Sequence, residues 1–534
     1  AHVNVFTLAG GPAFAVDGTI NGINIGKGAN SVSNNTCFGI NALDAAVTGG
    51  NNTAIGISTL TSLTSGANNV CVGANAGDVL TTSSINVAVG SGALGSATTG
   101  GNNVAVGGFA GSSATGGQNI FIGRNTGGST GSGVVFIGYF AGGNNTADNN
   151  IGIGYSALGS NTSGGSNTAV GYQCLDANTT GDFNTSVGHN SMGACISGER
   201  NVAMGFNALD SLTTGIYNVA IGMNALNGTN NNGSVAVGYN ALSTGTGAAN
   251  NALGYNAGAS LTSANHNLAI GYNALVNATV TQYNLAIGNF TLDAWTTNTG
   301  GANIAIGYNA MTSATSGSDN VVLGVNAQQN ATGSGNNTII GKGAGISLNI
   351  GSNVTCLGAN AGDSITSNGF NTCLGSASDV DSVNRHNATA LGYNVNTAAT
   401  NSSFRVTGDN GVFHTGNTTT WSTTSDERIK KNIVDNEQGL NVINAIKIRN
   451  FNYKTADEIA EASPELAELD LQQIAVNKTE LQIGAIAQEI ETVLPECVLN
   501  DDNGVKQVNA DRLIWHTIKA VQQLSDKVTA LESA

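Results

Sequence analysis

A repeat of about 17 residues fills most of this 534-residue chain and constrains its fold more than any other feature. The clearest copy, Asn267 to Leu275, reads NLAIGYNAL: an Asn, an aliphatic residue, a small residue, an aliphatic residue, the signature Gly, and a small-aliphatic pair farther on. The template matches 23 times between Gly26 and Gly392, and 15 of the 22 spacings between signature glycines are 17 residues. The residue before the Gly is apolar in all 23 copies, and Asn stands four residues before it in 18.

A repeat this short predicts a solenoid. One copy has room for two short strands and two turns and cannot bury its own apolar residues, so each copy must stack on the next. The segment N-V-A-I-G alternates as a strand does, with the residues three and one before the Gly on one face. We therefore predict a mainly β fold, a parallel β-solenoid (β-roll) of about 23 repeats and roughly 110 Å in length. Asn side chains at one register are expected to hydrogen-bond along the stack.

Charge divides the chain into a neutral shaft and a conventional domain. The first 400 residues hold five Lys or Arg, and the last 134 hold 12. We predict a cap or attachment segment at 1–20, the repetitive shaft at 21–400, a β neck at 401–424 and an α+β domain at 425–534. A net charge of −16 argues against nucleic acid and anionic membrane surfaces as partners. No apolar run approaches the length needed for membrane insertion.

Cysteines and histidines give no sign of a metal site. Cys37, Cys71, Cys356 and Cys373 occupy the small-residue position two before the Gly, where a thiol acts as a small buried hydrophobe. Cys356 and Cys373 fall on successive copies, which leaves a disulfide between them open. The spacings of Cys and His match no metal motif, so we predict neither a metal nor a cofactor.

The acids and aromatics of the shaft favour a structural or binding surface over an enzyme. Glycan cleavage needs two carboxylates about 5–10 Å apart. Asp176 and Asp210 look isolated and fall in turns, where Asp is common. Tyr155, Tyr255 and Tyr272 directly follow a signature Gly and suit either cover for apolar surface or stacking on sugars. Binding of a host glycan or receptor is therefore a hypothesis.

Two resemblances follow from these motifs. The N-x-V-A-I-G strand of the shaft resembles the left-handed parallel β-roll of trimeric autotransporter adhesin heads, and similar repeats occur in phage tail-fibre proteins. TTSDERIKKNI, GAIAQEIETVLPECV and VNADRLIWHTIKAVQQL resemble the intramolecular chaperone domain that ends phage tailspikes and tail fibres, best known from endosialidase tailspikes. The second resemblance covers roughly residues 420–534. It implies a domain that trimerises, templates folding of the shaft and then releases itself by autoproteolysis.

The same resemblance implies a catalytic dyad. In that family a Ser and a Lys five residues later form the dyad, and cleavage falls just before the Ser. Ser425 and Lys430 match this spacing, which places the scissile bond between Thr424 and Ser425. A Ser hydroxyl needs a base to become a nucleophile, and a neutral lysine amine serves as that base in Ser-Lys peptidases. The sequence leaves open whether this copy cleaves itself or carries only a solvated charged segment, and no other catalytic activity is predicted.

A heptad pattern predicts an assembly helix at about residues 511–532. The seam consists of Ile514, Val521 and Val528 at one heptad position and Leu524 and Leu531 at the other. In isolated coiled coils this pattern favours dimers, so a homotrimer is implied by the resemblance alone. Ahead of it we expect helices at 438–446 and 488–494 and strands at 449–454 and 481–487.

Two function classes remain open. The first is a homotrimeric virion tail fibre or spike that contacts tail or baseplate proteins and attaches to a host surface. The second is a bacterial cell-surface trimeric adhesin built from the same modules. A polysaccharide-degrading tailspike is a distant third.

Overall fold

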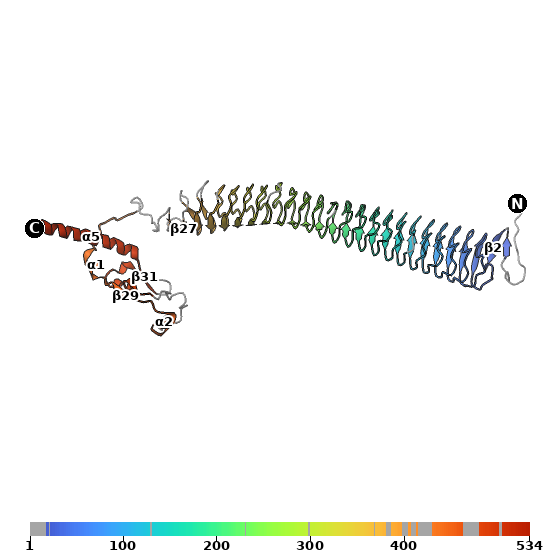
Figure 1. The fold of residues 1–534 in the computed structure, drawn as a ribbon, viewed down its shortest axis with the longest axis horizontal. Coiled ribbons are helices and arrows are strands. Elements are labelled where there is room, and N and C mark those ends of the chain that lie inside the picture. The colour runs from blue at the N-terminus through green and yellow to red at the C-terminus, as the bar shows by residue number, and fades with distance from the viewer. Residues whose placement is uncertain are drawn as a thin grey trace. The chain divides into compact units, whose positions relative to one another are not determined.

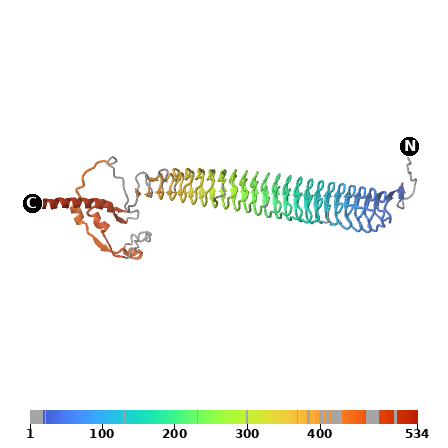
Figure 2. The same ribbon diagram turned by 45° about the horizontal axis from the view of Figure 1, so that its top comes forward.

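The structure is a computed structural model that describes residues 18–20, 22–128, 131–229, 231–296, 300–367, 369–380, 386–397, 404–406, 413–414, 430–462, 480–500 and 505–534. The chain divides into two compact units, Ala1–Thr423 and Thr424–Ala534. In the first unit the short strands of successive coils stack along one axis from β2 towards β27 (Figures 1 and 2). The two units are taken in turn.

The shaft has one short parallel strand per repeat, formed by the residues just before the signature Gly. These strands are β3 (Thr36–Gly39), β4 (Thr53–Ile55), β5 (Val70–Val72), β6 (Val87–Val89), β7 (Val104–Val106), β8 (Ile120–Ile122), β9 (Val135–Ile137), β10 (Ile151–Ile153), β11 (Thr168–Val170), β12 (Thr185–Val187), β13 (Val202–Met204), β14 (Val219–Ile221), β15 (Val235–Val237), β16 (Asn251–Leu253), β17 (Leu268–Ile270), β18 (Leu285–Ile287), β19 (Ile304–Ile306), β20 (Val321–Leu323), β21 (Thr338–Ile340), β22 (Thr355–Leu357), β23 (Thr372–Leu374) and β25 (Thr389–Leu391). Equivalent repeat positions pair directly, as Leu268 does with Leu285. The predicted parallel β-solenoid is confirmed.

In the described coils up to β22, only one of the two strands for which each repeat has room is formed, and a second short strand appears only at Asp379–Val380 and Asn396–Thr397 in the last two coils. After the signature Gly the backbone enters the left-handed region at alternate residues, with φ of 55° at Asn273 and 52° at Leu275. A β-strand does not allow that alternation. Hydrogen bonds still join this side of the coils, because Leu275 N donates to Thr291 O at 3.0 Å.

Antiparallel strands close both ends of the parallel stack. β1 (Gly18–Ile20) pairs antiparallel with β2 (Ile23–Gly26), which pairs antiparallel with β3. The copy that holds Gly26 therefore belongs to these closing strands and not to the parallel array. At the other end β27 (Phe404–Val406) lies parallel to β25 and antiparallel to β28 (Phe413–His414), while β24 (Asp379–Val380) and β26 (Asn396–Thr397) form a separate pair. Residues 1–17 and the predicted neck turns lie outside the described residues.

The central residue of each strand points into the solenoid. Ala269 is fully buried, whereas Leu268 and Ile270 on either side of it are only half-buried. The interior is therefore narrow and filled by small residues, and the aliphatic face of the strand lies outside. Where Phe121 replaces the small residue, Gly127 stands at the interior position that Leu275 fills in its own coil. A Cβ on Gly127 would lie 2.1 Å from Phe121 Cδ1, so the exchange keeps the interior volume.

A ladder of buried asparagines runs through the interior, as the repeat predicted. Asn69 N and Asn69 Nδ2 both donate to Asn52 Oδ1 at 3.0 Å, and Nδ2 also donates to Ser83 O at 2.9 Å. Asn86 repeats these bonds one coil later onto Asn69 Oδ1. A buried amide is tolerated only when its polar atoms are bonded, so each Asn fixes the register of the next coil.

The carboxyl-terminal unit is a small α+β body. Its elements are α1 (Leu440–Ala445), β29 (Arg449–Phe451), α2 (Ala456–Ala462), β30 (Gln482–Gly484), α4 (Ala487–Glu491), the 3-10 turn η3 (Pro495–Cys497), β31 (Val498–Asn500), β32 (Lys506–Val508) and α5 (Ala510–Glu532). β29 pairs with β30 and β31 with β32, both antiparallel. Ile490, Leu494 and Cys497 form its core. The expected helices and strands are present with bounds that differ by a few residues, whereas α2 and the β31–β32 hairpin were not predicted.

Candidate functional site

Of the two residues of the predicted dyad, only Lys430 lies within the part of the chain that the structure describes. Thr424 and Ser425 lie outside the described residues, and Lys430 is the exposed first residue of the described range 430–462. The pairing of Ser425 with Lys430 therefore stays a prediction.

Helix α5 holds the chain that follows Lys430. His516 is 8% exposed, and its Nδ1 lies 2.8 Å from Gln438 O. About two helical turns further on, Gln523 Nε2 donates to Glu437 O at 3.1 Å and Gln523 Oε1 accepts from Leu440 N at 2.7 Å. The inward face of α5 thus fixes residues 437–440 at two points.

The exposed side of α5 carries the predicted seam. Its side chains are largely in solvent: Ile514 54%, Val521 61%, Leu524 50%, Val528 45% and Leu531 78% exposed. Burying such a side chain stabilises an assembly by up to about 2 kcal/mol. A helix face of this kind is typical of coiled-coil association.

The shaft also exposes an apolar surface, here called the outer stripe. It consists of the residues three and one before the signature Gly, for example Ile55 39%, Val106 37%, Ile221 39%, Leu253 50%, Ile304 37% and Leu357 48% exposed. The residue one before the Gly is apolar in every coil from β4 to β25, whereas the residue three before it is polar in eight of these coils, for example Thr168, Asn251 and Thr338. A continuous apolar surface of this length is typical of an interface rather than of a monomer.

Aromatic residues that follow the signature Gly form a ladder along the shaft. The rings of Tyr155, Tyr172 and His189 stack with centroids 5.0 and 4.9 Å apart, and Tyr255 stacks on Tyr239 and Tyr272 at 5.0 and 5.1 Å. A ring inside such a ladder has both faces covered. Stacking of sugars on these tyrosines is therefore disfavoured, and the ladder covers the shaft instead.

The thiols of the chain are buried and unreactive. Cys356 and Cys373, which lie directly opposite each other on β22 and β23, carry free thiols, and so do Cys71, Cys174, Cys195 and Cys497. Burial raises the pKa of the Cys71 thiol to about 12, and a hydrogen bond from Cys356 together with burial raises that of Cys373. Since the thiolate is the nucleophile and the metal ligand, these residues serve packing.

Two acids that look isolated in sequence come together across Gly193. Asp210 Oδ1 and Asp176 Oδ1 lie 2.7 and 3.8 Å from the point that a Cβ on Gly193 would occupy. The sum of these distances, about 6.5 Å, is the upper limit of their separation and lies in the range of glycosidase carboxylates. Burial raises the pKa of both carboxyl groups, with His189 partly offsetting the effect at Asp210. The charge of Asp210 adds to the rise in the pKa of Asp176.

Near the carboxyl end of the shaft, Asp379 makes stability depend on pH. Its side chain is 6% exposed, and burial together with nearby Asp363 raises its pKa from 3.8 to about 6, although the bond from Ser364 N works against this. Because the folded pKa lies above the unfolded one, the folded state binds the proton more tightly. Stability is therefore lost as pH rises from about 4 to about 6 and stays constant above that range.

We expect the shaft to be more stable at pH 4.5 than at pH 7.5, with Asp379 contributing about 2 kcal/mol. Asp379→Asn should reduce the difference, and the exposed Asp44→Asn should leave it unchanged. Thermal unfolding followed by circular dichroism at the two pH values measures the effect. A shaft that becomes more stable as pH rises from 4.5 to 7.5 contradicts the assignment.

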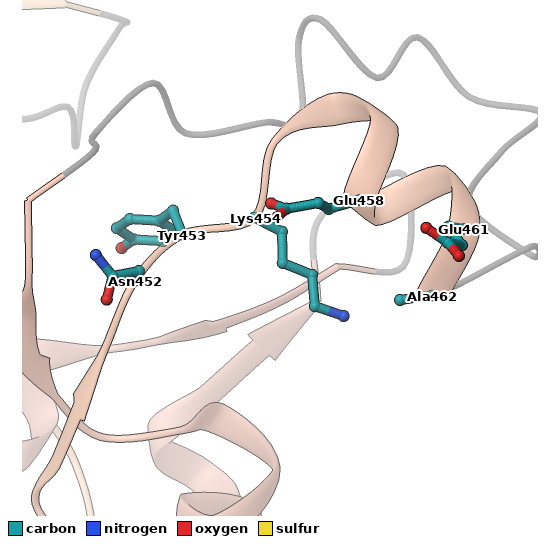
Figure 3. A pocket seen from close by; sticks show the side chains of 6 residues that line it. All are labelled: Asn452, Tyr453, Lys454, Glu458, Glu461 and Ala462. Carbon is teal, nitrogen blue, oxygen red and sulfur yellow. The ribbon is translucent and has the colours of Figure 1, made fainter.

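A groove of about 410 Å³ lies in the carboxyl-terminal unit, with Asn452, Tyr453 and Lys454 on one side and residues of α2 on the other (Figure 3). Glu458 Oε2 accepts from Thr455 N at 2.8 Å, and Glu458 N donates to Thr455 Oγ1 at 3.3 Å. This reciprocal pair is a capping box that starts α2. The carboxylate in the groove therefore has a structural role.

The part of the chain that the structure describes has neither of two further kinds of site. No group of three or more His, Cys, Asp or Glu side chains there is placed to hold a metal ion. No helix within the same ranges is long and apolar enough to cross a bilayer.

Comparison with protein families gives one match. Residues 425–499 match the model of the family described as chaperone of endosialidase. The whole chain has no match among curated proteins. The match begins at Ser425, the predicted nucleophile, and ends within the β31–β32 hairpin. A segment similar to the chaperone of endosialidase family thus follows a parallel β-solenoid in this chain, and the combination fits a tail-fibre-like or spike-like protein.

Proposed function

We propose that this chain is a subunit of a homotrimeric virion tail fibre or spike that attaches to a host surface. Its carboxyl-terminal unit acts as an intramolecular chaperone that assembles three chains, nucleates the solenoid and then releases itself by cleavage between Thr424 and Ser425. The observation that carries the proposal is the family match at residues 425–499 directly after the solenoid unit.

Two surfaces support the assembly of three chains. The seam of α5 and the outer stripe of the shaft both expose aliphatic side chains that a partner chain would cover. One lies in each compact unit, so each unit has its own surface for association. We assign both to contacts between identical chains.

A bacterial cell-surface adhesin built from the same modules is the second candidate, favoured by the resemblance of the shaft to adhesin heads. Electron microscopy of the native source separates the two. Rods on virions support the fibre, and rods on a bacterial envelope support the adhesin.

Self-cleavage is tested with single substitutions in the full chain. We expect the unmodified protein to yield a fragment of about 110 residues on a denaturing gel, and Ser425→Ala to remain at full length, because the nucleophile is gone. Lys430→Ala should also abolish cleavage, and Lys431→Ala is the matched control that should cleave normally.

Intact-mass spectrometry locates the new amino terminus at Ser425. A Ser425→Ala chain that still releases the fragment rules out the dyad. An unmodified chain that never cleaves rules out autoproteolysis and leaves the chaperone role to the assembly test described in the Discussion.

A further inference from the structure

The residue five before each signature Gly adopts the left-handed backbone conformation, and together these residues form a line along the shaft, here called the ridge. The backbone φ there is close to +60° in coil after coil, and Asn is the common occupant: Asn68 (61°), Asn102 (60°), Asn149 (59°), Asn336 (56°) and Asn353 (58°). Asn tolerates this conformation better than other residues with a Cβ.

Four large aromatic residues interrupt this pattern on the described ridge, namely Phe183, Tyr217, Tyr283 and Phe370, and two of them adjoin a groove. Phe183 and Tyr283 adopt φ of 59° with 55% and 62% of the side chain exposed. The left-handed region costs such a residue roughly 1–2 kcal/mol, and little burial offsets it. Neither the backbone nor the core accounts for these two rings, and strain of this kind is often associated with function.

An open groove of about 400 Å³ adjoins each ring. Beside Phe183 it extends over Ser166 and Asn149, the ridge residues of the two preceding coils. Beside Tyr283 it extends over Ala302 and Asp319, the ridge residues of the two following coils. The small ridge residue next to each ring leaves the hollow, and the volume is within the usual range for small-molecule sites, about 300–1,000 Å³.

Each ring has one face covered and the other turned to its groove. The guanidinium of Arg200, in the coil after Phe183, lies 5.4 Å from the Phe183 centroid, on the side away from the groove. The His266 ring, in the coil before Tyr283, stacks on it at 5.2 Å with an interplanar angle of 3°. This arrangement differs from the aromatic ladder, where neighbouring rings cover both faces.

Hydrogen-bonding groups surround each free face. Asp148 and Asp182 line the first groove, where backbone bonds to Ser132 N at 2.7 Å and Gly165 N at 2.6 Å orient them. Gln282, Ser318 and Asp319 line the second. A carboxylate has about four lone-pair sites, so each retains acceptor capacity for a ligand hydroxyl.

We propose that these two grooves are binding subsites for neutral sugar residues of a glycan. The C–H face of a pyranose stacks on Phe183 or Tyr283, and its hydroxyl groups donate to the neighbouring carboxylates. The acids in both grooves and the net charge of −16 select against anionic sugars. Six coils separate the two rings, a distance of about 29 Å along the axis. The proposal rests on host attachment as the function and names the ligand class.

The test replaces each ring by the common ridge residue. Phe183→Asn and Tyr283→Asn, made together in the full chain, keep a side chain that other coils accommodate at the same φ. Tyr255→Leu, in the covered ladder, is the matched control. Arrayed neutral hexasaccharides of glucose, galactose and mannose serve as probes, with polysialic acid and phosphorylated oligosaccharides as anionic counterparts. Calorimetry then measures the affinity for the neutral probe bound best.

We expect the unmodified protein to bind at least one neutral probe, the double variant to bind it at least roughly tenfold more weakly, and the control to bind unchanged. Binding of anionic probes alone, no binding at all, or full affinity in the double variant overturns the proposal. Sedimentation of the same samples separates this result from the fibre assignment. If the protein is a trimer that binds no glycan, only the proposal of glycan binding in the grooves is refuted. If the protein is a monomer, the proposed trimer assembly is refuted.

Discussion

Chains that end at Thr424 are expected to accumulate as insoluble shaft with little or no native trimer. Parallel coils must meet in register before their contacts form, and this slow search leaves unpaired strand edges exposed to aggregation. Loss of the seam on α5 removes the element that we assign to bringing three chains together. Once formed, the shaft should persist without the unit because its unfolding is slow.

The measurement is the soluble fraction after expression, with sedimentation to count chains. The full chain with Ser425→Ala is the matched control, since it keeps the carboxyl-terminal unit attached and should give a soluble, uncleaved trimer. Native soluble trimer from residues 1–424 alone would show that the shaft needs no chaperone.

The second large effect is expected from Gly205→Ala. This signature Gly has φ of +137°, and a Cβ on it would lie 2.6 Å from Gly222 O in the next coil. An alanine therefore meets both an unfavourable backbone region and a backbone clash that no side-chain rotation relieves. We expect a loss of roughly 3 kcal/mol or more, concentrated where the two coils meet.

Gly233→Asn is the matched control for this prediction. Gly233 also has positive φ, +62°, but a Cβ there would meet nothing within 4 Å, and Asn occupies the same register elsewhere. The control should be neutral or stabilising by about 0.5 kcal/mol. Thermal unfolding of the two variants compares them, and equal stability would show that the signature Gly is not required for close packing of coils.

Much of the shaft could be predicted because equivalent positions of successive repeats pair with each other, so the repeat itself gives the register between coils. The signature Gly, the apolar residue before it and the buried Asn ladder follow from one template, and the parallel pairing of Leu268 with Leu285 is its consequence. Which face of each strand points into the solenoid was harder to predict. Alternation separates Ala269 from Leu268 and Ile270, but only the narrow interior decides that the small residue points inward.

Neither the carboxylate pair of the shaft nor the candidate binding residues could be found from sequence, for a related reason. Asp176 and Asp210 are 34 positions apart, and their approach depends on an intervening glycine that leaves room for both side chains. In the sequence, nothing distinguishes Phe183 and Tyr283 from the other aromatic residues of the shaft. They become informative only when their positive φ, their exposure and the cover on one ring face are known together.

The antiparallel closures at the two ends have a consequence for how the number of repeats in such a shaft can change. β1 and β2 cover the first coil and β27 and β28 the last, and neither closure contacts the middle of the stack. Duplication or loss of a whole 17-residue repeat therefore leaves both closures intact. The length of the shaft can therefore change in increments of about 4.8 Å without a change in either closure.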